Sequence, residues 1–229
     1  MTSARVTAGA SREARVSAIL FDLDGVLVDS LLVVERSWRR WAREQDLSGD
    51  DVLAVVHGRT AREVIGLLTP HLDAAEQALL VGGYEREHRG DLALLPGARE
   101  CVGIARQGRW AVVTSGTRAL ATTRLAAVGL PVPEVLVTAD DVTFGKPDPE
   151  PYRRGAELIH SAPADCLVVE DAPSGVGAGI AAGCSVLGVL GTHTEKELRA
   201  AGASWIVRSL EDVSAQTSPN GVTLHLRAI

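Results

Sequence analysis

Short apolar runs alternate with amphipathic stretches along most of the chain. The first run, Val16–Phe21, ends directly before the acidic segment Asp22-Leu-Asp-Gly25. Five further runs have the length of buried strands: Trp110–Thr114, Val135–Thr138, Cys166–Val169, Val186–Leu190 and Ser204–Val207. Helical spacing follows over Ala98–Gln107, Thr117–Val128, Pro149–His160, Gly175–Ala182 and Glu195–Ala201. This alternation predicts an α/β fold with a Rossmann-like, doubly wound parallel sheet covered by helices on both faces.

The alternation is interrupted between residues 31 and 94. Apolar residues repeat there at helical spacing from Val34, a second helix is expected after Ser48, and two more are expected over Thr60–Leu68 and Asp73–His88. Thr60 and Glu63 have the spacing of a capping box. We therefore expect a helical domain over residues 31–94, inserted into a core made of residues 16–30 and 95–229.

The two ends of the chain have different patterns. Residues 1–15 lack a long apolar run and are expected to form a flexible tail. Near the other end, Asn220-Gly221 predicts a turn into a final edge strand, in which Val222, Leu224 and Leu226 alternate with polar residues.

Composition narrows the class of protein. A chain of 229 residues with 46% hydrophobic residues can bury a large core, and its net charge of -6 argues against a nucleic-acid partner. No apolar run reaches the ~18 residues that a membrane span needs. The cysteines lack metal-type spacing and lie in apolar stretches, as is typical of a reducing cytoplasm: Cys101, Cys166 and Cys184. We expect a cytoplasmic monomer without membrane or nucleic-acid partners.

Polar residues collect where the predicted strands end. Asp22 and Asp24 follow the first strand, Ser115-Gly116 follows the second, and Glu170-Asp171 follows the run Cys166–Val169, while Lys146 lies in a Gly-Lys-Pro loop. Ligands of open parallel sheets bind beyond the carboxyl ends of the strands. So many carboxylates need a counter-charge, and a hard divalent cation with oxygen ligands would supply it.

Taken singly, each segment has a simpler explanation. Asp-x-Asp-Gly is often a turn, Ser115 could cap a helix, and Gly-Lys-Pro is common in surface loops. However, only Lys146 and Lys196 are lysines among the 23 basic residues. A compact ammonium group is therefore kept at this one loop position in a chain that otherwise uses arginine.

Together the four segments resemble the signature motifs of the haloacid dehalogenase superfamily, in its phosphatase and phosphomutase division. They are Asp22-Leu-Asp-Gly-Val-Leu-Val-Asp29, Val112-Val-Thr-Ser-Gly-Thr117, Gly145-Lys-Pro-Asp-Pro149 and Val168-Val-Glu-Asp-Ala-Pro173. They occur in the family's order, and the helical insertion lies where that family has its first class of cap domain.

The resemblance implies a role for each residue. Asp22 would be the nucleophile that forms an aspartyl-phosphate, and Asp24 would be the general acid and base. The metal would be Mg²⁺, with ligands from Asp22, from Asp171, from the backbone carbonyl of Asp24 and, directly or through water, from Glu170. The phosphate would be bound by three groups: the Ser115 hydroxyl, the Gly116 amide and Lys146.

The cap resembles that of sugar-phosphate, 2-deoxyglucose-6-phosphate and glycerol-phosphate phosphatases. Its loop His57-Gly58-Arg59 would be the substrate-specificity loop, and the alternative is a solvated loop that caps a helix. Related beta-phosphoglucomutases usually carry a histidine in the first cap helix, where this chain has Val34. The resemblance thus implies a Mg²⁺-dependent phosphatase of small sugar or polyol phosphates. A phosphomutase and a non-catalytic phosphate-binding module, which would be expected to lack Asp22 or Asp24, are the alternatives.

Overall fold

A six-stranded parallel sheet forms the centre of the structure, a computed structural model that describes residues 11–56, 58–218 and 221–229. The strand order is β6–β5–β2–β7–β8–β9, and an order of this kind is that of a doubly wound sheet, the class of sheet predicted from the sequence. The strands are β2 (Ala18–Phe21), β5 (Arg109–Val113), β6 (Leu136–Val137), β7 (Cys166–Glu170), β8 (Ser185–Val189) and β9 (Trp205–Val207). The chain reverses its direction of winding at β2 and β7, where such folds bind ligands.

Helices cover both faces of this sheet. Alternation along β2 places Ile19 and Phe21 in one apolar cluster and Ala18 and Leu20 in the other. The first face is covered by α5 (Ala98–Ala105) and α6 (Arg118–Ala127). The second is covered by α7 (Glu150–Leu158), α8 (Pro173–Ala182) and α9 (Glu195–Ala200). The prediction of an α/β fold with a covered parallel sheet is confirmed.

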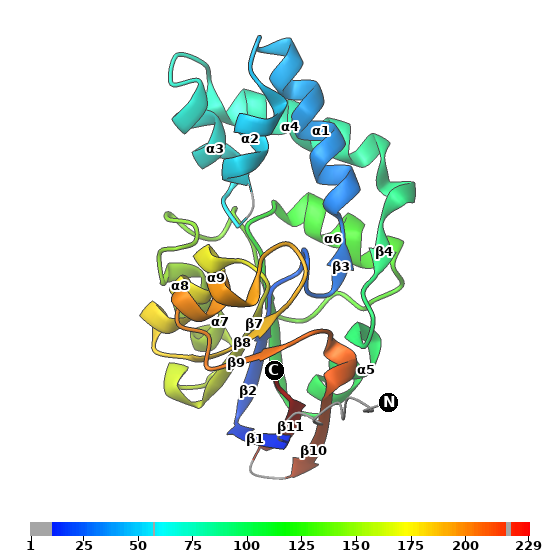
Figure 1. Cartoon of the computed structure of the whole chain (residues 1–229), viewed down its shortest axis with the longest axis vertical. Helices are drawn as coiled ribbons and strands as arrows, with labels where there is room; N and C mark the ends of the chain where they lie inside the picture. Colours follow the sequence, from blue (N-terminus) through cyan, green and yellow to red (C-terminus); the bar gives the residue numbers. More distant parts are fainter. Residues whose placement is uncertain (1–10, 57, 219–220) are drawn as a thin grey trace, which may run out of the picture.

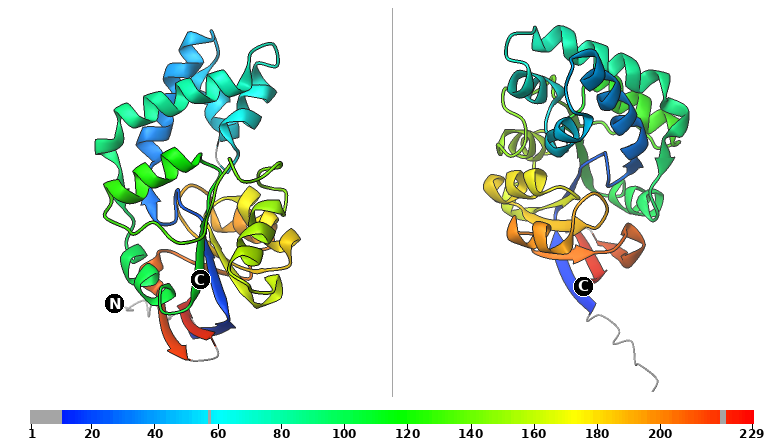
Figure 2. Two further views of the ribbon diagram at one scale, coloured as in Figure 1. Left: turned by 180° about the vertical axis from the view of Figure 1, so that it is seen from behind. Right: turned by 45° about the horizontal axis from the view of Figure 1, so that its top comes forward.

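Four helices form a separate layer at one end of the molecule, above the carboxyl ends of the sheet strands (Figures 1 and 2). They are α1 (Leu31–Glu44), α2 (Gly49–Val56), α3 (Ala61–Leu68) and α4 (Ala74–Glu87), followed by a 3₁₀ turn at Arg89–Asp91. We call this layer the cap. It has its own apolar cluster, in which Trp38 and Trp41 meet edge to face, and α3 begins with the predicted capping box of Thr60 and Glu63.

The cap is joined to the core through a short antiparallel pair. Strand β3 (Val28–Asp29) precedes the cap and pairs with β4 (Ala93–Leu94), which follows it. The two connections therefore leave the core side by side. Among the described residues, no helix combines the length and the apolar character that crossing a membrane would require.

The predictions for the two chain ends need correction. Residues 11–15 are not part of a tail: β1 (Ser11–Val16) pairs with β11 (Gly221–Arg227), which also pairs with β10 (Val213–Ser218). Strand β11 is thus the middle strand of three, although Val222, Leu224 and Leu226 do face the core as expected. The predicted first strand is also interrupted at Ser17, while Asn220 and residues 1–10 lie outside the described residues.

This small sheet could not be foreseen from local sequence. Its first strand offers only Ala14 and Val16 to the apolar cluster, and its partner strand is about two hundred residues away along the chain. The sheet lies at the end of the molecule opposite the cap (Figure 1).

Candidate active site

The predicted acidic residues meet at the carboxyl ends of β2 and β7, which are neighbours in the sheet. Asp22 directly follows β2, and its backbone amide donates a hydrogen bond of 2.9 Å to the carbonyl of Val169. Glu170 ends β7 and Asp171 follows it. Parallel pairing in this register therefore brings three carboxylates from two segments to one point.

Lys146 lies between two of these carboxylates. Its Nζ is 2.8 Å from Asp22 Oδ1 and 2.7 Å from Glu170 Oε1, and it also donates to the carbonyl of Val113 at 3.1 Å. We call Lys146, Asp22 and Glu170 the Lys146 cluster. Burial acts to lower the pKa of Lys146, but the two carboxylates outweigh it and raise that pKa above its ordinary value. The buried ammonium group therefore stays charged.

Glu170 has partners on both oxygens. Oε1 also accepts a hydrogen bond of 2.8 Å from the hydroxyl of Tyr152, and Oε2 accepts from the backbone amides of Asp171 and Ala172. Sequence reasoning did not identify Tyr152, which is fully buried in α7. Its hydroxyl is the signal that was missed, because a buried tyrosine normally finds a polar partner.

Asp22, Glu170 and Asp171 together could hold a metal ion. One oxygen from each lies within 4.8 Å of the others, and all three residues are buried. Burial raises the pKa of Asp22 to about 7, against the opposing effect of Lys146. Burial and the neighbouring carboxylates also raise the pKa of Asp171. Clustered buried carboxylates favour a bound hard cation, and this donor set fits one.

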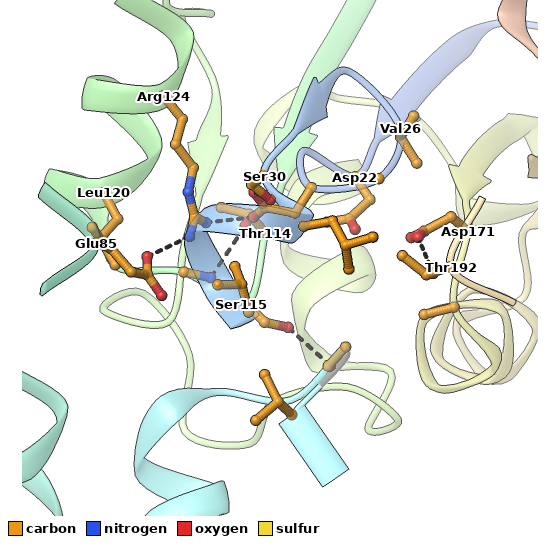
Figure 3. Close-up of a pocket in the computed structure, with 18 of the residues that line it drawn as sticks. Asp22, Val26, Ser30, Glu85, Thr114, Ser115, Leu120, Arg124, Asp171 and Thr192 are labelled. Carbon is orange, nitrogen blue, oxygen red and sulfur yellow. Dashed lines mark hydrogen bonds and ion pairs between the residues drawn. The ribbon is translucent and has the colours of Figure 1, made fainter. Parts of the chain in front are cut away.

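The turn after Asp22 packs directly against this cluster. Gly25 has a φ of 78°, and a Cβ at that position would lie 2.1 Å from Asp171 Oδ2. Only glycine fits both the backbone conformation and the space. On the other side, the Thr192 hydroxyl donates a hydrogen bond to Asp171 (Figure 3). Asp171 is thus fixed between two loops.

Asp24 lies in a second group of charged residues. Its Oδ1 accepts a hydrogen bond of 2.7 Å from the Ser30 hydroxyl, and its Oδ2 is 2.5 Å from Nη1 of Arg124. The other terminal nitrogen of Arg124 binds Glu85 of the cap helix α4. We call Asp24, Arg124 and Glu85 the Arg124 bridge. Figure 3 shows Arg124 and Glu85 on one side of the pocket and Asp171 and Thr192 on the other, with Asp22 between them.

The sequence contained a signal for this bridge that we did not use. Arg124 lies on the buried face of α6 with Ala121 and Leu125, and Glu85 lies on the buried face of α4 with Val81. Charged residues on apolar helix faces are rare unless they are paired. Burial acts to lower the pKa of Arg124, but the Asp24 and Glu85 carboxylates outweigh it and the pKa rises. Burial raises the pKa of Glu85, which Arg124 opposes.

The predicted phosphate-binding groups lie beside these clusters and have protein partners. The Ser115 hydroxyl donates to the carbonyl of Gly58 at 3.1 Å, and the Gly116 amide donates to the Thr114 hydroxyl at 3.1 Å. A ligand that binds to either group has to replace these bonds. The exchange at Ser115 also involves the cap, because Gly58 belongs to it.

A cavity of about 650 Å³ lies between the cap and the core. Asp22, Asp24 and Asp171 line it from the core, and Val34 and Trp38 line it from the cap. Its size is that of a small-molecule site. Apart from cysteines and tyrosines, the buried ionisable side chains of the described residues all belong to the Lys146 cluster, the Arg124 bridge or the group of three carboxylates. They are Asp22, Glu85, Arg124, Lys146, Glu170 and Asp171.

The predicted specificity loop contributes to this cavity through Gly58 and Arg59, whereas His57 lies outside the described residues. Gly58 has a φ of 78°, and a Cβ there would lie 1.9 Å from Ser174 Oγ. Arg59 follows helix α2, and its side chain donates a hydrogen bond of 3.2 Å to the carbonyl of Val55 in the last turn of that helix. The loop therefore packs tightly on the core, and Arg59 makes the contact expected from the helix-capping alternative.

Comparisons with known proteins support the family that the four motifs predicted. The family model of the haloacid dehalogenase-like hydrolases matches residues 16–183. Hexitol phosphatase A of Escherichia coli K12 is 40% identical over 215 residues, which cover 90% of this chain and 97% of that protein. Glycerol-1-phosphate phosphohydrolase 1 of Saccharomyces cerevisiae is 30% identical and covers 87% of this chain and 84% of its own length.

A solved structure shows the same fold. The crystal structure of a hydrolase from Pseudomonas syringae superposes with a TM-score of 0.78 at 26% identity, covering 86% of this chain and 95% of that one. The family predicted from the four motifs is confirmed. This chain belongs to the haloacid dehalogenase-like hydrolases.

Proposed function

We propose that the protein is a Mg²⁺-dependent phosphatase that hydrolyses small sugar or polyol phosphate monoesters through an aspartyl-phosphate on Asp22. The observation that carries this proposal is the position of Asp22. Its buried carboxylate accepts a hydrogen bond from the Lys146 ammonium group and lines the cavity under the cap. It also lies close enough to the Asp171 carboxylate for both to bind one metal ion. The similarity to a hexitol phosphatase and a glycerol-1-phosphate phosphohydrolase supports the class of substrate.

The metal would be held by Asp22, by Asp171 and by the backbone carbonyl of Asp24. When bound, Mg²⁺ would offset the repulsion between the attacking carboxylate and the phosphate. Glu170 is a poorer candidate for a direct ligand, because both of its oxygens already accept hydrogen bonds. We infer that Glu170 acts mainly as the counter-charge that holds Lys146 in place, and that any contact with the metal would be through water.

The reaction would proceed in two displacements. A carboxylate oxygen of Asp22 attacks phosphorus, the ester P–O bond breaks, and Asp24 gives its proton to the leaving alkoxide. A water molecule then attacks the phosphorus of the aspartyl-phosphate and gives a proton to Asp24. The bond between phosphorus and Asp22 breaks, inorganic phosphate leaves, and Asp22 and Asp24 return to their initial states.

Other groups of the chain would bind the phosphate during both steps. Lys146 contributes a fixed positive charge beside Asp22. The Ser115 hydroxyl and the Gly116 amide would exchange their present acceptors, the Gly58 carbonyl and the Thr114 hydroxyl, for phosphate oxygens. Lys146 is buried and Ser115 and Gly116 are half-buried, so their electrostatic interactions would be stronger than in water.

The cap would exclude bulk water and contact the leaving group through His57, Gly58 and Arg59. Val34 lines the cavity from the first cap helix and has no group that could carry a proton. That supports water, rather than a second sugar hydroxyl, as the final acceptor of the phosphoryl group.

The proposal is tested by measuring phosphate release from a panel of hexitol, hexose, pentose and glycerol phosphates with Mg²⁺. We expect release from at least one hexitol or hexose phosphate, loss of activity with EDTA, and loss of activity in a folded Asp22→Asn variant. Absence of release across the panel would contradict the proposal. Conversion of beta-glucose-1-phosphate to glucose-6-phosphate with little free phosphate would instead identify a phosphomutase.

A further inference from the structure

Arg124 joins a core carboxylate to a cap carboxylate through two different nitrogens. Nη1 lies 2.5 Å from Asp24 Oδ2, and Nη2 binds Glu85 of α4. Arg124 is 5% exposed and Glu85 is 7% exposed. The two side chains therefore interact away from bulk water, where an ion pair is weakly screened and its geometry is well defined.

The helices that carry these residues lie against each other. A Cβ added at Gly82 of α4 would come within 3.7 Å of Leu120 of α6, which is ordinary van der Waals contact. Helix α4 therefore lies close enough to α6 for Glu85 to reach Arg124. Because Glu85 belongs to a cap helix, Arg124 has this second partner only when the cap lies on the core.

Asp24 is held on both of its oxygens. Ser30 occupies Oδ1 and Arg124 occupies Oδ2. A guanidinium group is planar and rigid, so a carboxylate on one nitrogen fixes the direction of the other nitrogen. Glu85 thereby limits where Arg124 can hold Asp24, even though Glu85 itself does not touch Asp24.

We propose that Arg124 is a positioning residue that holds Asp24 in reach of the leaving oxygen, and that the cap residue Glu85 fixes Arg124 for this task. The inference rests on the proposed function, in which Asp24 is the acid. It adds that the proton donor is correctly placed only when the cap is seated. Closure of the cap would then select the substrate and, at the same time, place Asp24 for proton transfer.

The inference is tested by how activity depends on the leaving group. An alkoxide from a polyol phosphate needs a proton as the ester bond breaks, whereas p-nitrophenolate leaves readily without one. The ratio of kcat/KM values for the two esters reports the first displacement only. In Arg124→Met we expect kcat/KM for the polyol phosphate to fall roughly 10- to 100-fold, and for p-nitrophenyl phosphate to fall less than about threefold.

Two further variants separate positioning from folding. Glu85→Gln keeps the shape of the side chain and should lower the same ratio in the same direction, by a smaller factor. Arg124→Lys, which keeps a positive charge beside Asp24, should restore part of the ratio. In an Asp24→Ala background, Arg124→Met should change kcat/KM for p-nitrophenyl phosphate little further, because the residue on which Arg124 acts is already gone.

The matched controls are ion-paired residues on the same helices. Arg118→Met removes an arginine of α6 that binds Asp141, and Glu87→Gln removes a carboxylate of α4 that binds Arg40. Neither should alter the ratio. An equal loss on both esters in Arg124→Met and Glu85→Gln, with the wild type active, would overturn the positioning role and leave the proposed function standing. A wild type inactive on both esters would overturn both.

Discussion

The two buried cations of the site are placed in different ways. Lys146 binds Asp22 and Glu170, both from the core, and its third partner is a core carbonyl. Arg124 binds one carboxylate from the core and one from the cap. The Lys146 cluster is therefore complete whenever the core is folded, whereas the Arg124 bridge is complete only when the cap is in place.

This difference separates two tasks. Asp22, the proposed nucleophile, and the carboxylates grouped with it lie at one edge of the sheet, where parallel strands fix their positions. Asp24, the residue proposed as the proton donor, is bound by Arg124. The second partner of Arg124, Glu85, belongs to the cap, which has its own apolar cluster. Steps that need only the core and steps that need the cap should therefore respond differently to substitution.

The largest expected effect is the loss of Lys146. Lys146→Met leaves Asp22 and Glu170 buried without their counter-charge, and breaking a buried ion pair from one side costs about 3–5 kcal/mol. We expect the free energy of unfolding to fall by that amount, with loss of activity on every ester. Denaturant unfolding measures the first effect and phosphate release the second.

The control for Lys146 is the second lysine of the chain. Lys196 is exposed on α9, and Lys196→Met should change the free energy of unfolding by no more than about 0.5 kcal/mol. Equal stability of the two variants would contradict the assignment of Lys146 as the central counter-charge of the core site.

The next effect is stabilisation by the metal and its dependence on pH. Without an ion, the pKa of Asp22 is about 7. An acid whose pKa is raised by folding stabilises the fold at low pH and loses that contribution as pH rises through the folded-state value. A cation binds the deprotonated form, so Mg²⁺ should stabilise the protein more above that pKa than below it.

Thermal unfolding with Mg²⁺ and with EDTA measures this effect. At a concentration about 100 times the dissociation constant, Mg²⁺ should stabilise the fold by about 2.7 kcal/mol above the pKa. One pH unit below the pKa, the gain should be about 1.4 kcal/mol smaller. Asp171→Asn should reduce the gain at both pH values, and a gain independent of pH would contradict this account of Asp22.

The smallest effect concerns the contact between the cap loop and the core. Gly58→Ala introduces a Cβ that would lie 1.9 Å from Ser174 Oγ in a left-handed backbone conformation. We expect a loss of about 1–2 kcal/mol in unfolding free energy, together with lower activity, because the loop that binds Ser115 has to move.

Gly66→Ala is the matched control for this substitution. Gly66 lies in α3 of the same cap, and a Cβ there meets nothing within 4 Å. Alanine should stabilise that helix by about 0.5–1 kcal/mol. If Gly58→Ala were also stabilising, the described packing of the loop on the core would be contradicted.

The sequence was informative wherever a residue's place depends on a strand directly before it. Asp22 and Glu170–Asp171 lie at the ends of short, fully buried strands, so the parallel sheet brings them together as predicted. Lys146 was identified from its motif, although no local pattern indicates that it reaches two carboxylates from different strands. The core elements also agreed with the predicted ranges to within a few residues.

The features that were missed depend on contacts between distant segments. Pairing of β1 with β11 joins the two ends of the chain, and residues 11–15 carry too few apolar groups to reveal it. In the Arg124 bridge, Arg124 is 100 positions away from Asp24 along the chain and 39 positions away from Glu85. Its members are visible in the sequence only as charges on buried helix faces, and their pairing follows from how α4 rests on α6.

The central claim, that Asp22 carries the phosphoryl group during turnover, is tested most directly by mass spectrometry of protein quenched in acid during steady-state hydrolysis. We predict one added phosphoryl group on the peptide that contains Asp22. It should be absent in Asp22→Asn and should disappear when substrate is exhausted. A phosphoryl group on another residue, or an unmodified peptide under conditions that trap acyl phosphates, would contradict the account.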